Sequence, residues 1–198
     1  MQTLRTGIGL YLLIASSAVF GQTTGTCERP FEAKFQPGGK IHMELRSGDI
    51  EVRGSDSPML RISCELRAPG RAKEVTIKFT SAGSFSDLRI RGGPNGDVRF
   101  RIEVPKNLNL SVRAPAGVVN VSGVTGDKNI EIHAGDLIIS VGNADDYRHA
   151  DASVYAGDLS ASAFGVTKGG LFRSFDKDNS KGKYRLHAHV GAGDLVLK

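Results

Sequence analysis

Four aspartates recur in one short phrase, and they are the first residues whose type and spacing could do chemistry. In each copy a small residue and a Gly precede the Asp, and an aliphatic residue follows it. The copies are RSGDIEVR, HAGDLIIS, YAGDLSAS and GAGDLVLK, with carboxylates at Asp49, Asp136, Asp158 and Asp194. If such phrases stack as neighbouring strands, the carboxylates lie ~4.8 Å apart. That spacing could hold calcium, or two carboxylates across a groove could cleave a glycosidic bond.

Turn formation is nevertheless the role we expect for these aspartates. Calcium-binding β-rolls repeat a nonapeptide with several glycines, and this chain has no such repeat. It also has no Trp to form a platform for sugar rings. Gly tolerates positive φ and Asp bonds nearby backbone, so the pair suits a corner, and we expect no catalytic residue and no cofactor. The predicted structural turns are Gly48, Asp49, Gly117, Gly135, Asp136, Gly157, Asp158, Gly193 and Asp194.

Two histidines form an H-x-H pattern that could start a metal site. His187 and His189 share one face of a predicted strand, and His133 precedes another corner that could stack nearby. A third and a fourth ligand are not identifiable, so we expect histidines that face solvent and no metal. The chain also lacks a nucleophile elbow, a phosphate-binding Gly loop and a dinucleotide fingerprint.

Four arginines are the candidate binding residues. The chain carries a formal net charge of +5, and its excess of Lys and Arg lies in residues 61–113. The segment DLRIRGGPNGDVRFRIEV is interpreted as a hairpin closed by GGPNG, with its arginines on the face opposite the core. This face is either an anion-binding surface or simply solvated. The arginines are Arg89, Arg91, Arg99 and Arg101.

The elements that must position these residues are β-strands. Apolar residues alternate with polar ones along most of the chain, as in Val98/Phe100/Ile102/Val104, and Gly is abundant at 25 residues. The motif glycines recur in units of about 18–22 residues, and Val118 replaces the Asp after Gly117. A unit that short cannot bury its own apolar face. The sequence therefore predicts an all-β fold, either a β-solenoid or a roll-like β-sandwich of stacked units.

The first 21 residues are typical of a secretory signal peptide. A single Arg5 precedes an uncharged, largely apolar run, and we expect cleavage before Gln22. The alternative is a membrane anchor, although the apolar part is short for a ~30 Å hydrocarbon core. Residues 22–198 then form one exported domain without a transmembrane span. In an oxidising compartment Cys27 and Cys64 could form a disulfide or stay buried thiols, and the sequence leaves both open.

Two stretches carry a resemblance to a known family. GGKIHMELRSGDIEVRG and RFRIEVPKNLNLSVRAPAGVVNVSGVTGDKNIEIHAGDLIIS resemble the bacterial family of exported domains named "putative adhesin", whose function is unknown. The Val104–Pro105 step before the repeated turns matches that family as well. The resemblance covers residues 31–198 and implies a repetitive β-fold outside the cytoplasm, with no catalytic residues to transfer. Residues 170–184 depart from the repeat and are expected to form an exposed loop.

These observations predict a non-catalytic binding or scaffolding module in the periplasm or at the cell surface. The alternative is a carbohydrate-active β-helical enzyme that acts on envelope or extracellular polysaccharide. The expected partners are anionic polysaccharide, lipid headgroups or another envelope protein. Nucleic acid is not expected, because the protein is predicted to be exported.

Overall fold

The protein is built almost entirely from β-strands, which confirms the all-β prediction. The computed structural model describes residues 21–94 and 98–198, so the signal peptide predicted for residues 1–21 lies outside it except for Gly21. The described residues form one mixed sheet of sixteen strands. They also contain three short 3₁₀ helices, Pro69–Glu74, Ala144–Asp146 and Ser162–Phe164.

The strands of the N-terminal half are β1 (Gly21–Thr26), β2 (Phe31–Lys34), β3 (Lys40–Glu44), β4 (Gly48–Ser55), β5 (Met59–Leu66), β6 (Val75–Ala82), β7 (Phe85–Gly92) and β8 (Val98–Pro105). Those of the C-terminal half are β9 (Asn109–Ser122), β10 (Lys128–Ile139), β11 (Tyr147–Ala156), β12 (Leu159–Ala161), β13 (Val166–Lys168), β14 (Leu171–Asp178), β15 (Tyr184–Ala192) and β16 (Leu195–Leu197).

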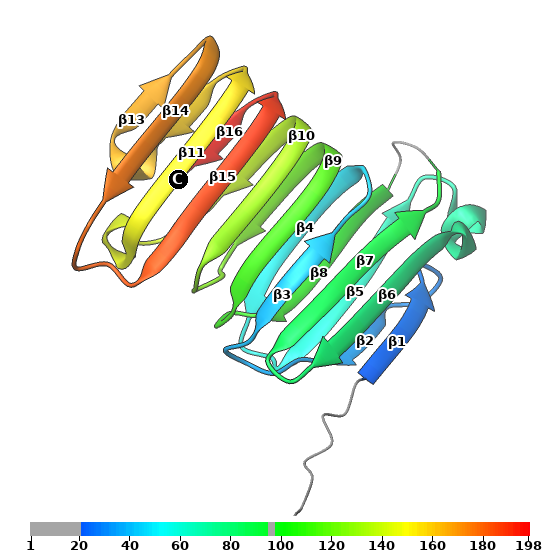
Figure 1. The fold of residues 1–198 in the computed structure, drawn as a ribbon. Helices are drawn as coiled ribbons and strands as arrows, with labels where there is room; N and C mark the ends of the chain where they lie inside the picture. The colour runs from blue at the N-terminus through cyan, green and yellow to red at the C-terminus, as the bar shows by residue number, and fades with distance from the viewer. Residues whose placement is uncertain (1–20, 95–97) are drawn as a thin grey trace, which may run out of the picture.

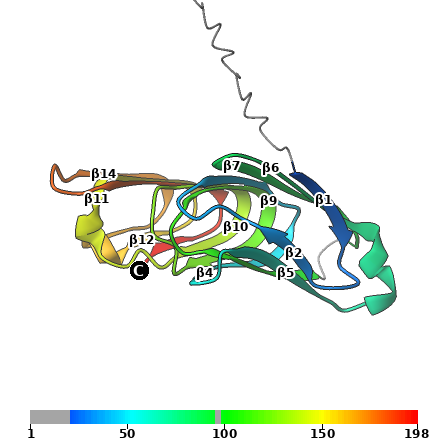
Figure 2. The same ribbon diagram turned by 90° about the horizontal axis from the view of Figure 1, so that it is seen from below.

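The sheet folds into two layers that face each other across the core (Figure 1, Figure 2). The upper layer of Figure 2 has the order β1-β6-β7-β3-β9-β10-β15-β11-β14. The lower layer has the order β2-β5-β8-β4-β9-β10-β16-β12-β13. The long strands β9 and β10 belong to both layers and turn from one to the other at a glycine. The apolar residues of both layers meet in a single buried core.

Alternation along each strand produces this core. In β8 the side chains of Val98, Phe100, Ile102 and Val104 are buried, while Arg99 and Arg101 are exposed. The pleat of a strand sends successive side chains to opposite faces, so one face of each layer is apolar and the other is polar.

Glycines stack on one another where the chain passes from the upper to the lower layer. Gly48 pairs with Gly117, and Gly117 pairs with Gly135. A Cβ on Gly193 would lie 2.2 Å from the Gly135 carbonyl oxygen, and one on Gly157 would lie 2.0 Å from that of Gly193. All five have positive φ. The corner therefore needs glycine both for its backbone angle and for the close approach of the neighbouring corner.

The order of the strands in space differs from their order in the chain at one place. The last two strands, β15 and β16, lie between β10 on one side and β11 and β12 on the other, all in parallel (Figure 1). The strands β11 and β12 precede β15 in the chain but lie farther out. At the outer end β14 pairs with β11 in the antiparallel sense.

Two details of the sequence interpretation change. The predicted hairpin of Arg89, Arg91, Arg99 and Arg101 is wrong, because β7 pairs with β6 and β3 while β8 pairs with β4 and β5. The strands β7 and β8 lie in different layers, and each shows the same alternation of buried and exposed residues that it would show in a hairpin. Part of the connection between them, residues 95–97, lies outside the described residues.

The loop expected for residues 170–184 is also wrong over most of its length, because Leu171–Asp178 is the edge strand β14. Only Phe175 of this strand is buried, so its alternation is too weak to recognise. Near the other end of the molecule, Cys27 and Cys64 form a disulfide with a Cα–Cα distance of 5.5 Å, which joins the β1–β2 connection to β5.

Candidate functional site

Five titratable side chains gather on the outer face of the upper layer, at its C-terminal end. We call them the histidine–aspartate cluster: His149, Asp151, Asp176, Asp178 and His187. They come from the neighbouring strands β11, β14 and β15. Strand register brings them together, since His149 pairs with Asp178 and Asp151 lies between Asp176 and His187.

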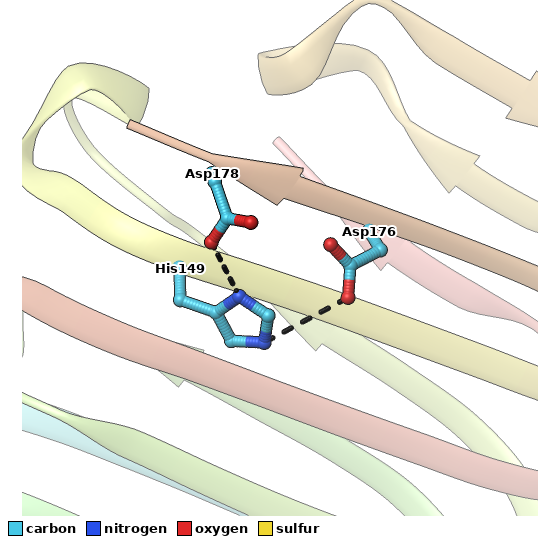
Figure 3. A group of neighbouring side chains, drawn as sticks. All are labelled: His149, Asp176 and Asp178. Carbon is cyan, nitrogen blue, oxygen red and sulfur yellow. Dashed lines mark hydrogen bonds and ion pairs between the residues drawn. The ribbon is translucent and has the colours of Figure 1, made fainter. Parts of the chain in front are cut away.

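His149 lies at the centre of the cluster (Figure 3). Its Nδ1 is 2.9 Å from Asp178 Oδ1. Its Nε2 is 3.4 Å from Asp151 Oδ1 and 3.8 Å from Asp176 Oδ2. The hydrogen bond with Asp178 raises the pKa of His149 above its ordinary value. Burial opposes this change, and the charges of Asp176, Asp178 and Asp151 raise the pKa further.

Asp151 connects the two histidines. Its Oδ2 is 2.6 Å from His187 Nδ1, while its other oxygen faces His149. The side chains of Asp151 and His187 are 30% and 44% exposed. The cluster is therefore an open surface feature, in which two imidazoles and three carboxylates could exchange protons or hold a cation.

The H-x-H pattern predicted that His187 and His189 share one face of a strand, and both do lie on the same face of β15. They have separate partners, however: His189 Nδ1 is 2.8 Å from Ser153 Oγ, whereas His187 faces Asp151. His133 lies on β10, the strand next to β15, and lines a hollow together with Glu131 and Arg113. His149 and the three aspartates of the cluster were missed, because each is an ordinary polar residue on its own strand and only the pairing of β11 with β14 brings them together.

The four arginines do not form one surface. Arg89 and Arg91 lie on the outer face of the upper layer and both pair with Glu44, and Arg89 also pairs with Asp87 at 2.9 Å. The single arginine face that the hairpin predicted is therefore wrong, and anion binding by either pair of arginines stays a prediction.

The other two arginines, Arg99 and Arg101, line a groove of about 440 Å³ on the outer face of the lower layer. Arg101 pairs with Glu65 at 2.9 Å and with Glu51 at 3.5 Å, and Arg99 pairs with Asp49 at 3.6 Å. Carboxylates thus accompany all four guanidinium groups, on two faces that point in opposite directions.

The motif aspartates lie at the glycine corners, and two of them, Asp136 and Asp194, accept backbone hydrogen bonds. Asp136 Oδ1 accepts the N–H of Asp194 at 3.2 Å, and Asp194 Oδ1 accepts the N–H of Asp158 at 3.0 Å. These two carboxylates thus join their corners to neighbouring corners in space. For these two aspartates the predicted bond to backbone exists, but its donor lies at a neighbouring corner, 36 or 58 residues away in the sequence.

Three exposed, largely apolar side chains gather on the same strands, β11 and β14, at the end away from the cluster. We call Tyr155, Leu171 and Phe172 the aromatic end. Their exposed fractions are 57%, 61% and 68%, and the Tyr155 and Phe172 rings meet edge to face at 4.5 Å. Phe172 has φ 54°, which makes it the one non-glycine residue with positive φ among residues 21–94 and 98–198. Such a conformation costs a bulky residue ~1–3 kcal/mol, and it often marks a functional position.

Comparisons with known proteins identify the fold only. No family model matches the chain, and no curated protein matches it. A solved structure from Clostridium sporogenes, described as a "putative cell adhesion protein", superposes with a TM-score of 0.55 at 11% identity. The superposition covers 86% of this chain and 99% of the other. In the part of the chain that the structure describes, no helix has the length and apolar character needed to cross a membrane.

Proposed function

We propose that this protein is a non-catalytic, exported binding or scaffolding module of the bacterial envelope, built as a short β-solenoid of the adhesin type. The stacked glycine corners and the long parallel pairing of β9 with β10 support the solenoid interpretation. The resemblance of the sequence to exported adhesin-like domains and the fold shared with the Clostridium sporogenes protein support the adhesin type.

The aromatic end is the observation that carries the binding role. Large apolar side chains that gather on a surface mark contact sites more often than singly scattered ones do. Three of the four exposed large hydrophobic residues of the described chain lie here. Phe172 adds to the argument because its strained backbone holds the ring out into solvent, where the ring contributes little to the core.

Polysaccharide is the ligand class that fits this surface best. An aromatic ring offers an apolar face to the C–H groups of a sugar ring, and hydroxyl groups can hydrogen-bond to polar side chains nearby. Ser153 and Ser174 lie between the aromatic end and the histidine–aspartate cluster, on the same outer face. An elongated polymer could therefore lie along β11 and β14.

Binding of the purified protein to uronic-acid and neutral polysaccharides tests this proposal. A variant with Tyr155→Ala and Phe172→Ala should lose binding at least about tenfold. The matched control is Phe85→Ala, because Phe85 is also an exposed aromatic, 47% exposed, but lies on β7 far along the sheet. Equal binding by both variants would contradict the aromatic end as the contact surface. Consumption of a polysaccharide by the wild-type protein would favour the alternative, a carbohydrate-active enzyme.

A further inference from the structure

The histidine–aspartate cluster holds more negative charge than its surroundings neutralise. Asp151 and Asp176 lie directly opposite each other in the antiparallel pair of β11 and β14, where like charges destabilise a sheet. Among the residues that the structure describes, the ion-pair partners of Asp151, Asp176 and Asp178 are histidines and not Lys or Arg. Farther along the same face, Glu131 pairs with Arg113 at 3.2 Å. A bound cation would remove the repulsion that the cluster retains.

The imidazole of His149 is oriented as in a metal site. Its Nδ1 is held at 2.9 Å from Asp178, so its Nε2 points toward Asp176 (Figure 3). Asp151 Oδ1 lies on the same side, 3.4 Å from Nε2. A histidine that binds a metal through one nitrogen almost always gives its other N–H to a carboxylate or carbonyl group. Asp178 is in the position of that outer carboxylate. Asp151 is held in a similar way, since its second oxygen meets His187 Nδ1 at 2.6 Å.

The remaining distances suit ligands that share an ion. Zinc binds His nitrogen and carboxylate oxygen at ~2.0–2.2 Å, so two ligands of a tetrahedral zinc lie about 3.4 Å apart. His149 Nε2 is 3.4 Å from Asp151 Oδ1 and 3.8 Å from Asp176 Oδ2. The group whose ligand atoms already lie within 4.8 Å of one another is His149, Asp176 and Asp178, so the Asp151 and Asp176 carboxylates must move closer together to share an ion with His149. The Asp176 side chain is 65% exposed, which leaves it free to rotate toward an ion.

We propose that this cluster binds one divalent transition-metal cation of the zinc type. His149 Nε2, Asp151 and Asp176 are its ligands, and water completes the coordination. Asp178 and His187 hold the ligands from outside. A nitrogen donor among only two or three carboxylates favours zinc over calcium, which takes six to eight oxygen ligands.

Equilibrium dialysis of the purified protein against zinc tests the proposal, with cobalt(II) absorption as a report on the coordination geometry. We expect one zinc per chain and no displacement by excess calcium. His149→Ala and Asp176→Asn should each weaken zinc binding by about 100-fold or more, because each removes a ligand. Asp178→Asn should weaken it by about 10–100-fold, because it removes an outer partner.

The matched control is His189→Gln, which changes a histidine on the same face whose partner is Ser153. It should bind zinc as the wild type does. Circular dichroism of each variant without metal verifies folding, and the exposed edge position of Asp176 makes Asp176→Asn the safest variant. The proposal is overturned if the wild type retains no zinc, if His149→Ala binds zinc like the wild type, or if calcium displaces the zinc.

Discussion

At the scale of single residues, the least expected feature is a lysine in the core. Lys128 is 2% exposed, and its Nζ donates to the Tyr147 hydroxyl at 2.6 Å and to the Gly126 carbonyl at 3.3 Å. Tyr147 in turn donates to the Val141 carbonyl at 3.1 Å. Burial lowers the pKa of Lys128 to about 8 and raises the pKa of Tyr147 to about 12. Both changes follow from the cost of a charge away from water.

This pair predicts how stability depends on pH. Between pH 8 and 10.5 the unfolded chain holds a proton on Lys128 that the folded chain has lost, so the free energy of unfolding should rise with pH. Above pH 10 the unfolded Tyr147 ionises first, and the free energy of unfolding should fall again. Lys128→Met should remove the first rise and stabilise the protein at pH 7 by about 1–3 kcal/mol. Urea unfolding of the wild type and of Lys128→Met at pH 7, 8.5 and 10 measures the rise and the stabilisation.

The control for this prediction is Lys40→Met, since Lys40 is exposed on β3. Its replacement should leave the pH profile unchanged. A wild-type profile that stays flat from pH 8 to 10 would contradict the description of Lys128 as a buried cation.

At the scale of elements, the glycine corner decides whether a strand can continue from one layer into the other. Two costs combine there, because a side chain at Gly135 would face a positive φ of 108° and would lie 2.0 Å from the Gly117 carbonyl oxygen. Gly142 carries only the first of these two costs. It has a φ of 79° with no atom within 4 Å of an added Cβ.

Gly142→Ala should therefore cost only the backbone strain, about 1 kcal/mol, whereas Gly135→Ala should cost at least about 2 kcal/mol more. The second cost arises because neighbouring backbones must separate, which breaks hydrogen bonds on both sides of the corner. Chemical denaturation of the two variants measures the difference. Equal costs would mean that the corners do not approach as closely as described.

Also at this scale, alternation in the sequence identifies the faces of strands but not their partners. It predicts the inward residues of β8 and β10 and the turn glycines, because burial and positive φ depend on local pattern. It could not assign β7 and β8 to different layers, since both pairings leave the same residues outside. It also missed β14, where only Phe175 is buried, and the cluster built on β14. The position of Lys128 depends on Tyr147, nineteen residues away, and no local pattern contains that information.

At the scale of the whole molecule, the inserted strands β15 and β16 connect the two ends of the structure. In the described residues, β11 pairs with β15 and β14, and β12 pairs with β16 and β13. By strand pairing, the segment from β11 to β14 is thus joined to β10 only through β15 and β16, which pair with both. Across the described ranges, β11 to β14 therefore form no strand pair with β1 to β10.

Deletion of residues 184–198 tests this dependence. We expect residues 144–183 to detach and unfold, while β1 to β10 stay folded on their own core. Hydrogen exchange followed by mass spectrometry should show full exchange over residues 144–183 and protection before them, with the full-length protein as reference. Protection of β11 in the shortened protein would mean that β11 can pair directly with β10, contrary to this prediction.

The insertion of the last strands also sets an order in time. During synthesis β11 to β14 emerge before β15 and β16, so they cannot dock through these strands until residues 184–198 have been made. The strands therefore cannot dock one after another in their order along the chain. The histidine–aspartate cluster draws on β11, β14 and β15, so His187 joins the other four residues only after β15 has been made.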